Sequence, residues 1–183
     1  PVIEAGTVLK VIANAAVGYN NIDVAAAREH GIVVTNTPGV LTDATADLTW
    51  ALILGITRRI GEGERLIRRG EWRGWTFDFM LGAELGGKQL GIVGYGGIGR
   101  AVAARGRAFG MRIAYTSRTS KNDPDAEAMA LDRLLATSDV VSLHCPLTRE
   151  TRHLIDQPAL ARMKRSAYLI NTSRGPVVDE KAL

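Results

Sequence analysis

The feature that most constrains the fold of this chain is a glycine-rich turn near its middle. A continuous apolar run at residues 88–94 leads into Gly94-Tyr95-Gly96-Gly97-Ile98-Gly99, and a helical pattern follows over residues 98–109. The spacing G-x-G-x-x-G is weak evidence by itself, but between a strand and a helix it predicts a turn that binds a dinucleotide. Gly94 would permit the tight bend, Gly96 the close approach of a pyrophosphate, and Gly99 the packing of helix against strand.

Strand and helix patterns alternate along the whole chain. Strands are predicted at residues 9–13, 32–36, 88–94, 111–116, 139–143 and 167–171. Helices are predicted at residues 24–30, from a cap at Thr42 or Asp43 to about 60, in a further run toward Gly70, and at 98–109, 131–137 and 157–164. Unbroken apolar strands alternating with helices indicate a parallel sheet covered on both faces. The predicted fold class is therefore α/β, with a Rossmann-type doubly wound sheet.

Composition narrows the classes of partner. The 183 residues carry 23 basic and 19 acidic side chains, a net charge of +4 that is too mild and too interspersed to indicate nucleic acid. The basic cluster within residues 58–69 lies among Glu62, Glu64 and Glu71, which favours a solvated helix face over an anionic partner. The most apolar stretch, residues 48–56, is far shorter than the roughly 20 residues of a membrane span. The single cysteine, Cys145, excludes an intramolecular disulfide and predicts a reducing, cytoplasmic location.

The end of the strand after the glycine turn indicates which dinucleotide binds. An NAD site usually places Asp or Glu there, about 20 residues beyond the turn, to bind the ribose hydroxyls. Here the position holds Ser117, Arg118 and Thr119 and no carboxylate, because Asp123 and Asp125 come too late in the loop. These donors would favour a 2′-phosphate, so NADP(H) is the predicted preference. The alternative is that Arg118 stacks on the adenine and NAD(H) is accepted as well.

Four further motifs resemble those of the D-isomer-specific 2-hydroxyacid dehydrogenases, and the likeness covers nearly the whole chain. They read AVGYNNID from residue 16, GIVVTNTPG from 31, SDVVSLHCPLT from 138 and INTSRGPVVD from 170. Four ordered motifs at compatible spacing are far more specific than any one of them. Within the family, the chain looks most like the glyoxylate/hydroxypyruvate reductases.

The resemblance implies an oxidoreductase that transfers a hydride between NAD(P)H and a small 2-oxo or 2-hydroxy acid. It implies that residues 1–38 are part of a flavodoxin-like substrate domain and that residues 39–183 form the dinucleotide-binding domain with a crossover helix and a dimerisation arm. It also implies a homodimer, for which apolar surface would come from Leu48, Leu52, Leu54, Ile56 and the aromatic residues of 72–79. The alternative is that these side chains cover only their own domain.

The resemblance also assigns roles to single residues and implies no metal. Arg174 would bind the substrate carboxylate and polarise the reacting carbonyl, and the N–H groups of Val17 and Gly18 would hold the other side of that carboxylate. A guanidinium suits this role because it grips a carboxylate with two hydrogen bonds and favours a developing oxyanion. The cofactor would be contacted by Gly94, Tyr95, Gly96, Gly97, Ile98 and Gly99 at the pyrophosphate, by Ser117, Arg118 and Thr119 at the ribose, and by Cys145, Pro146, Thr151, Thr172 and Ser173 along the cleft. Cys145 is expected to be a small buried residue and not a nucleophile, because no base is paired with it.

Two departures from the family pattern affect these expectations. The family's acid–base histidine lies beyond the arginine motif, whereas His30, His144 and His153 all precede it. Both ends look cut, so we expect a fragment that binds dinucleotide and turns over little substrate alone. The segment before the helix at residue 131 is short, so the third strand of the sheet is expected to be missing or disordered.

Other functions stay open at this point. One is another dehydrogenase of the family, acting on 3-phosphoglycerate or D-lactate, although the neutral Asn14 near Val17 favours a small substrate. A second is a non-catalytic dinucleotide sensor of the corepressor kind, because fold does not settle function. A third is the binding domain of another NAD enzyme such as adenosylhomocysteinase, which should lack the pattern at residues 171–175.

Overall fold

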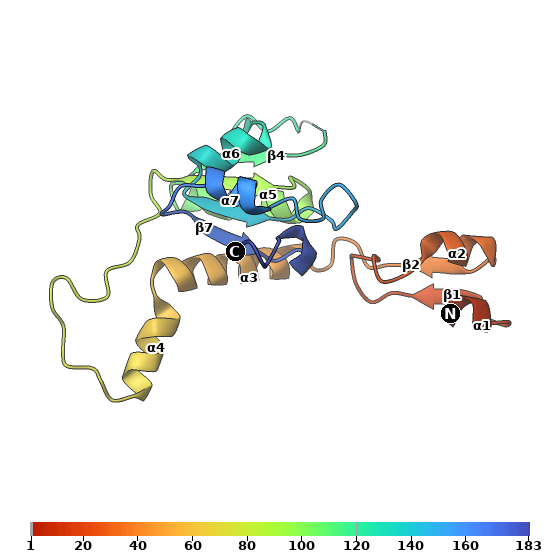
Figure 1. Ribbon diagram of the computed structural model, residues 1–183, viewed down its shortest axis with the longest axis horizontal. Coiled ribbons are helices and arrows are strands. Elements are labelled where there is room, and N and C mark those ends of the chain that lie inside the picture. The colour runs from red at the N-terminus through yellow and green to blue at the C-terminus, as the bar shows by residue number, and fades with distance from the viewer. Residues whose placement is uncertain (1, 120) are drawn as a thin grey trace. The chain divides into compact units, whose positions relative to one another are not determined.

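The computed structural model describes residues 2–119 and 121–183, which form two compact units. The first unit extends to Thr42, and the second runs Asp43–Leu183. Figure 1 shows the first unit in red and orange and the second from light orange to blue. Which unit serves substrate and which serves cofactor stays a prediction of the sequence.

The first unit contains two short parallel strands joined through a helix. Its elements are α1 (Val2–Ala5), β1 (Val11–Ala13), α2 (Val24–Glu29) and β2 (Val33–Thr35). Asp23 caps α2 as predicted, because its side chain accepts a hydrogen bond of 2.9 Å from the N–H of Ala26. Gly31, at a φ of 67°, follows the end of this helix in the left-handed conformation that glycine favours.

The second unit is a five-stranded parallel sheet with helices on both faces. Its strands are β3 (Gln89–Val93), β4 (Arg112–Thr116), β5 (Glu127–Ala128), β6 (Val140–Leu143) and β7 (Tyr168–Asn171), in the spatial order β5-β4-β3-β6-β7. Its helices are α3 (Thr42–Thr57), α4 (Ile60–Arg68), α5 (Gly97–Ala108), α6 (Leu131–Thr137) and α7 (Gln157–Arg162), and a short 3-10 helix, Gly175–Val177, follows β7. The predicted α/β class and the doubly wound parallel sheet are confirmed.

Two hydrophobic clusters cover the sheet, one on each face. Every residue of β3 and β6 is buried, as expected for central strands of a parallel sheet. One cluster packs Trp50 and Ile53 of α3 and Val102 of α5 against Leu90, Ile92 and Ile113. The other packs Leu134 and Leu135 of α6 and Ala159 of α7 against Val93, Val141 and Leu143. Figure 1 accordingly shows α3 and α6 on opposite sides of the sheet.

The third strand, expected to be missing or disordered, is present as β5. It has two residues, and Ala114 and Tyr115 of β4 stand opposite Glu127 and Ala128. Neither residue of β5 is β-branched or aromatic, so the sequence carries no strand signal there.

The long helix predicted to about residue 60 ends three residues earlier, at Thr57, and it begins at Thr42, so neither Thr42 nor Asp43 is a cap that precedes it. The carbonyl of Thr57 accepts a hydrogen bond of 2.8 Å from the N–H of Ala83. Arg59 then takes a φ of 57°, which breaks the helical path before α4 starts.

The segment after α4 is extended, as predicted, and residues 71–88 contain no helix or strand. Leu85 is buried in the core, and the rings of Trp72 and Phe79 meet edge to face at 5.8 Å. Trp75 and Phe77 are 77% and 85% exposed. No helix in the described part of the chain combines the length and apolar character that a membrane span requires.

Candidate functional site

The glycine turn after β3 has a shape that only glycine permits at two of its positions. Gly94 adopts a φ of 96°, and a Cβ there would lie 2.6 Å from the backbone nitrogen of Cys145. A Cβ at Gly99 would lie 2.3 Å from the carbonyl oxygen of Gly94. Gly96 differs, because a Cβ built on it meets no atom within 4 Å. Gly94 and Gly99 therefore serve packing, while Gly96 borders open space.

This open space lies at the amino end of α5. Gly96 is the N-terminal cap of that helix and has no side chain to occupy the helix's first N–H groups. The first N–H groups of any helix lack partners within the helix, and its dipole favours anions there. A helix end with free donors and room beside Gly96 fits the pyrophosphate of a dinucleotide. The roles of Gly97 and Ile98, the first residues of α5, agree with this placement and stay predictions.

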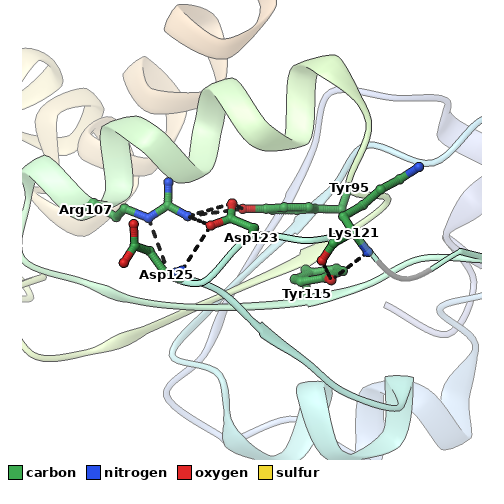
Figure 2. Close-up of polar contacts among 6 residues, drawn as sticks. All are labelled: Tyr95, Arg107, Tyr115, Lys121, Asp123 and Asp125. Carbon is green, nitrogen blue, oxygen red and sulfur yellow. Dashed lines mark hydrogen bonds and ion pairs between the residues drawn. The ribbon is translucent and has the colours of Figure 1, made fainter.

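Tyr95 lies in the turn, but its side chain points into the protein. It is 1% exposed and stacks on Tyr115 of β4 with ring centroids 4.1 Å apart. Its hydroxyl donates a hydrogen bond of 2.6 Å to Asp123, as Figure 2 shows. Burial, reinforced by this carboxylate, raises the pKa of Tyr95 to about 12. Only the backbone of Tyr95 is therefore left for the predicted pyrophosphate contact.

The loop after β4 presents the residues predicted to meet the ribose. Arg118 and Thr119 are exposed, and the hydroxyl of Ser117 donates a hydrogen bond of 2.6 Å to the carbonyl of Thr119. Lys121 is fixed at both of its backbone groups by the hydroxyl of Tyr115, at 2.7 and 2.9 Å. Sequence reasoning missed this anchor because Tyr115 reads simply as an apolar strand residue.

A polar cluster that the sequence did not predict joins the carboxyl ends of β6 and β7 to α3. The Nε2 atom of His144 lies 2.8 Å from the buried hydroxyl of Ser142, and its Nδ1 atom lies 3.4 Å from the hydroxyl of Thr172. The hydroxyl of Thr172 is also 2.9 Å from that of Thr49. Burial lowers the pKa of His144 to about 4, so the ring is neutral at physiological pH. Thr172, predicted to lie by the nicotinamide, is thus held in position from two sides.

Three more of the residues predicted along the cleft follow β6. Cys145 is 7% exposed, and burial raises the pKa of its thiol, in line with a packing role. The hydroxyl of Thr151 donates a hydrogen bond of 2.6 Å to the carbonyl of Pro146 and accepts one of 2.7 Å from the N–H of Thr148. Pro146 and Thr151 therefore form one turn directly beyond Cys145.

Arg174 follows the carboxyl end of β7 within a turn that Asn171 organises. The side-chain oxygen of Asn171 accepts hydrogen bonds from the N–H and the hydroxyl of Ser173, and its amide donates one of 2.9 Å to the carbonyl of Arg174. The Arg174 guanidinium donates to the carbonyl of Ser173 at 2.9 Å. Arg174 also lines one end of a cavity of about 940 Å³ that runs along β7 from Lys164 to Gly175. Arg174 itself lies at the carboxyl end of the strand. Ligands of open α/β sheets bind at this end of the strands.

Val17 and Gly18 lie in a loop of the first unit that two asparagines hold. The amide of Asn36 donates a hydrogen bond of 2.9 Å to the carbonyl of Val17, and the amide of Asn14 donates one of 2.9 Å to the carbonyl of Gly18. These contacts are accepted by the carbonyl groups of Val17 and Gly18. They do not involve the N–H groups, whose binding of the substrate carboxylate stays a prediction. Sequence reasoning cited Asn14 only for its lack of charge.

Comparison with known proteins identifies what the chain is similar to. Residues 50–183 match a family described as the D-isomer specific 2-hydroxyacid dehydrogenase, NAD binding domain. A glyoxylate reductase of Thermococcus litoralis is 53% identical over 99% of this chain. The crystal structure of the TT0316 protein from Thermus thermophilus is 53% identical and superposes with a TM-score of 0.92, covering 95% of this chain and 56% of that one.

A third relative carries bound ligands. It is a D-lactate dehydrogenase from Aquifex aeolicus complexed with NAD and lactic acid, 37% identical, with a TM-score of 0.88 and covering 95% of this chain and 53% of that one. The chain spans 57% of the length of the Thermococcus litoralis relative.

Proposed function

This chain belongs to the D-isomer specific 2-hydroxyacid dehydrogenase family, and on that premise we propose that it supplies the cofactor cleft of a glyoxylate/hydroxypyruvate reductase. Such an enzyme transfers a hydride between a nicotinamide dinucleotide and a small 2-oxo acid. The observation that carries the proposal is the glycine turn, where Gly94 and Gly99 admit no side chain and Gly96 borders open space at the start of α5. Relatives named glyoxylate reductase at 53% identity support the substrate class.

The residues of this chain have distinct tasks in that reaction. The bound dinucleotide supplies or accepts the hydride. The N–H groups at the start of α5 hold the pyrophosphate, and the fixed hydroxyl of Thr172 orients the nicotinamide side. Arg174 binds the substrate carboxylate, and its permanent positive charge stabilises the oxygen that becomes negative as hydride reaches the carbonyl carbon. Val17 and Gly18 would complete carboxylate binding from residues 1–38, the proposed substrate domain, while residues 39–183 bind the cofactor.

We further propose that NADP(H) is preferred over NAD(H). Ser117, Arg118 and Thr119 follow β4 and offer donors without a carboxylate, and Arg118 and Thr119 are exposed. A 2′-phosphate adds charge and acceptor oxygens that a guanidinium binds well. The D-lactate dehydrogenase of Aquifex aeolicus was solved with NAD, so a protein similar to this chain binds NAD.

Titration of the chain with NADPH and NADH, followed by nicotinamide fluorescence, tests both proposals. We expect binding of both and a lower Kd for NADPH. Arg118→Asp should invert the preference, because a carboxylate would repel the 2′-phosphate and accept hydrogen bonds from ribose. Arg133→Asp is a matched control, since Arg133 lies beside Gln89 and Arg112 at the opposite ends of the strands. Absence of dinucleotide binding would refute the cofactor site, and an unchanged preference in Arg118→Asp would refute the specificity assignment.

A second substrate remains a specific candidate, because the Aquifex aeolicus relative is a D-lactate dehydrogenase. Glyoxylate, hydroxypyruvate and pyruvate compete for the same carboxylate-binding arginine and differ in the group beside the carbonyl. Because this chain alone is expected to turn over little substrate, kcat/KM for the three acids with NADPH is measured on the full-length protein, and that comparison decides between them. We expect glyoxylate or hydroxypyruvate to exceed pyruvate at least tenfold, about 1.4 kcal/mol in transition-state binding.

We also propose that two copies of the chain pair, in the cytoplasm, through α3 and the extended segment at residues 71–88. Leu48, Leu52 and Ile56 on α3 are between 44% and 55% exposed, as large apolar side chains at an interface would be in a single copy. Leu54, predicted as part of this surface, instead packs against the core of its own unit. Sedimentation velocity should give a dimer, and Trp75→Ser with Phe77→Ser should shift it toward monomer.

A further inference from the structure

We propose that Arg107 is a specificity residue that cancels the charge of Asp123 and so keeps the ribose side of the cleft open to a 2′-phosphate. The inference rests on the proposed dinucleotide site and concerns residues to which that proposal gives no role. Asp123 is the first carboxylate in the chain after β4. An acidic side chain after this strand is the usual means of selecting NAD.

The carboxylate of Asp123 has its hydrogen-bonding capacity filled from within the protein, as Figure 2 shows. Its Oδ1 atom accepts from Arg107 at 2.8 Å and from the N–H of Asp125 at 3.1 Å. Its Oδ2 atom accepts from Arg107 at 2.8 Å and from the hydroxyl of Tyr95 at 2.6 Å. A carboxylate offers about four acceptor sites. All of them are used, so Asp123 has none left for ribose hydroxyls.

The charge of Asp123 is balanced by Arg107 and not by protonation. The hydrogen bonds from Tyr95 and Arg107 lower the pKa of Asp123, which keeps it ionised. The side chain of Asp123 is 18% exposed and that of Arg107 is 32% exposed, so water screens the pair only in part. Loss of Arg107 would therefore leave one uncompensated negative charge on the loop after β4.

This charge sits on a loop that is fixed to the glycine turn. Tyr95 belongs to the turn and donates to Asp123, while Arg107 belongs to α5, the helix that the turn begins. Tyr115, stacked on Tyr95, holds both backbone groups of Lys121. Residues 117–119 are therefore bracketed by Tyr115 and Lys121, both anchored, so the charge of Asp123 is held at a fixed place on the loop that meets the adenosine.

The test compares Kd values of Arg107→Met for NADPH and NADH at low ionic strength. A 2′-phosphate adds a charge of about −2 to the ligand, so we expect NADPH binding to weaken about tenfold and NADH binding to change less than about threefold. The difference between the two cofactors should shrink in high salt, because the Debye length falls from about 30 Å at 0.01 M to about 3 Å at 1 M. The double variant Arg107→Met/Asp123→Asn removes both charges and should restore most of the ratio.

Two further variants test whether Arg107 acts on cofactor affinity through its charge or only through its contribution to the fold. Asp123→Asn leaves Arg107 positive and should move the ratio of affinities toward NADPH, opposite to Arg107→Met. Arg105→Met is the matched control, because Arg105 lies on the same helix and pairs with other carboxylates, those of Asp43 and Asp47. This variant should leave the ratio of NADPH to NADH affinity unchanged. If Arg107→Met does not fold, the sign of the Asp123→Asn effect decides.

The possible outcomes distinguish this inference from the proposed function. If the unaltered chain binds neither dinucleotide, the proposed site is wrong and the inference fails with it. If the chain binds both and Arg107→Met weakens them equally, or Asp123→Asn lowers the relative affinity for NADPH, the inference alone is wrong.

Discussion

Two neighbouring segments of the proposed cofactor site, the glycine turn after β3 and the loop after β4, are held in place by different kinds of contact. The turn is shaped by backbone atoms that approach so closely that Gly94 and Gly99 leave no room for a Cβ. The loop is shaped by side chains, with Tyr95, Arg107 and Tyr115 holding Asp123 and Lys121. A backbone contact tolerates no substitution, whereas a side-chain contact can be exchanged or removed singly.

The difference matches the chemistry expected at each place. A pyrophosphate is common to NAD and NADP, so the turn that we propose to bind it needs only one shape. The ribose carries the only difference between the two cofactors, and a loop held by exchangeable side chains can be altered there without rebuilding the sheet. The four predictions below challenge this contrast, from the largest expected effect to the smallest.

The largest effect is expected from Gly99→Ala in the turn. Its Cβ would stand 2.3 Å from the carbonyl oxygen of Gly94, so α5 must shift away from β3. We expect the free energy of unfolding in urea to fall by about 3 kcal/mol. Gly55→Ala is the matched control, because a Cβ there meets nothing within 4 Å and alanine favours a helix. Equal urea midpoints for the two variants would contradict the steric account.

The second prediction concerns His144, which follows β6 and lies against Gly94 of the turn. The free energy of unfolding should depend on pH through this side chain. The folded pKa is about 4 against an ordinary 6.5, so the unfolded chain binds more protons in this window and stability falls as the pH drops from 6.5 toward 4. We expect His144 to contribute a loss of about 2 kcal/mol between pH 7.5 and 5. Urea unfolding of His144→Asn at both pH values should lack this part of the loss, and an identical pH dependence would count against a neutral ring.

Gly96→Ala should separate binding from folding within the turn. Because a Cβ at Gly96 meets no protein atom within 4 Å, the free energy of unfolding should fall by no more than about 1 kcal/mol, the cost of alanine in place of glycine at the N-cap of α5. The methyl group would occupy the space left for the pyrophosphate, so the Kd of NADPH and of NADH should both rise about tenfold, or about 1.4 kcal/mol. Calorimetric titration measures this, and unaltered affinity would show that the pyrophosphate binds elsewhere.

The smallest effect is expected from Tyr115→Phe in the loop. The variant removes the hydroxyl that contacts both backbone groups of Lys121. We expect a loss of about 1 kcal/mol in unfolding free energy and faster hydrogen exchange at the Lys121 amide. Tyr19→Phe, at a position 54% exposed in the first unit, provides the control with no expected change. Unchanged exchange at Lys121 would show that the loop does not need this anchor.

The sequence predicted best what depends on local patterns. The parallel sheet, the glycine turn and the cap at Asp23 follow from apolar runs, glycine spacing and a side chain that acts within three residues. The two-residue β5 escaped prediction because it exists only by pairing with β4. The end of α3 at Thr57 also escaped, because it is marked by the φ of 57° at Arg59 and by a hydrogen bond from the N–H of Ala83, and neither leaves a local pattern in the sequence.

The candidate site also has side chains that local motifs indicate and side chains whose contacts depend on the fold. The family resemblance indicated Arg174 as a candidate, but not that Asn171 holds its turn. Asp123 was excluded as a ribose ligand because it comes late in the loop. Its partners Tyr95 and Arg107 lie on segments that meet it only in the folded chain, so its ion pair could not be predicted. Hydrogen bonds between distant residues leave no periodic trace in a sequence, so such networks require coordinates.

The brevity of β5 has a consequence for the behaviour of the protein in concentrated solution. An outer strand offers its unpaired donors and acceptors to any passing extended peptide, and long flat edges invite such pairing. With two residues, Glu127 among them and in an ion pair with Arg133, this edge gives an incoming chain little to align with. Brevity here protects the sheet from self-association on that side, where a strand of ordinary length would have required another safeguard.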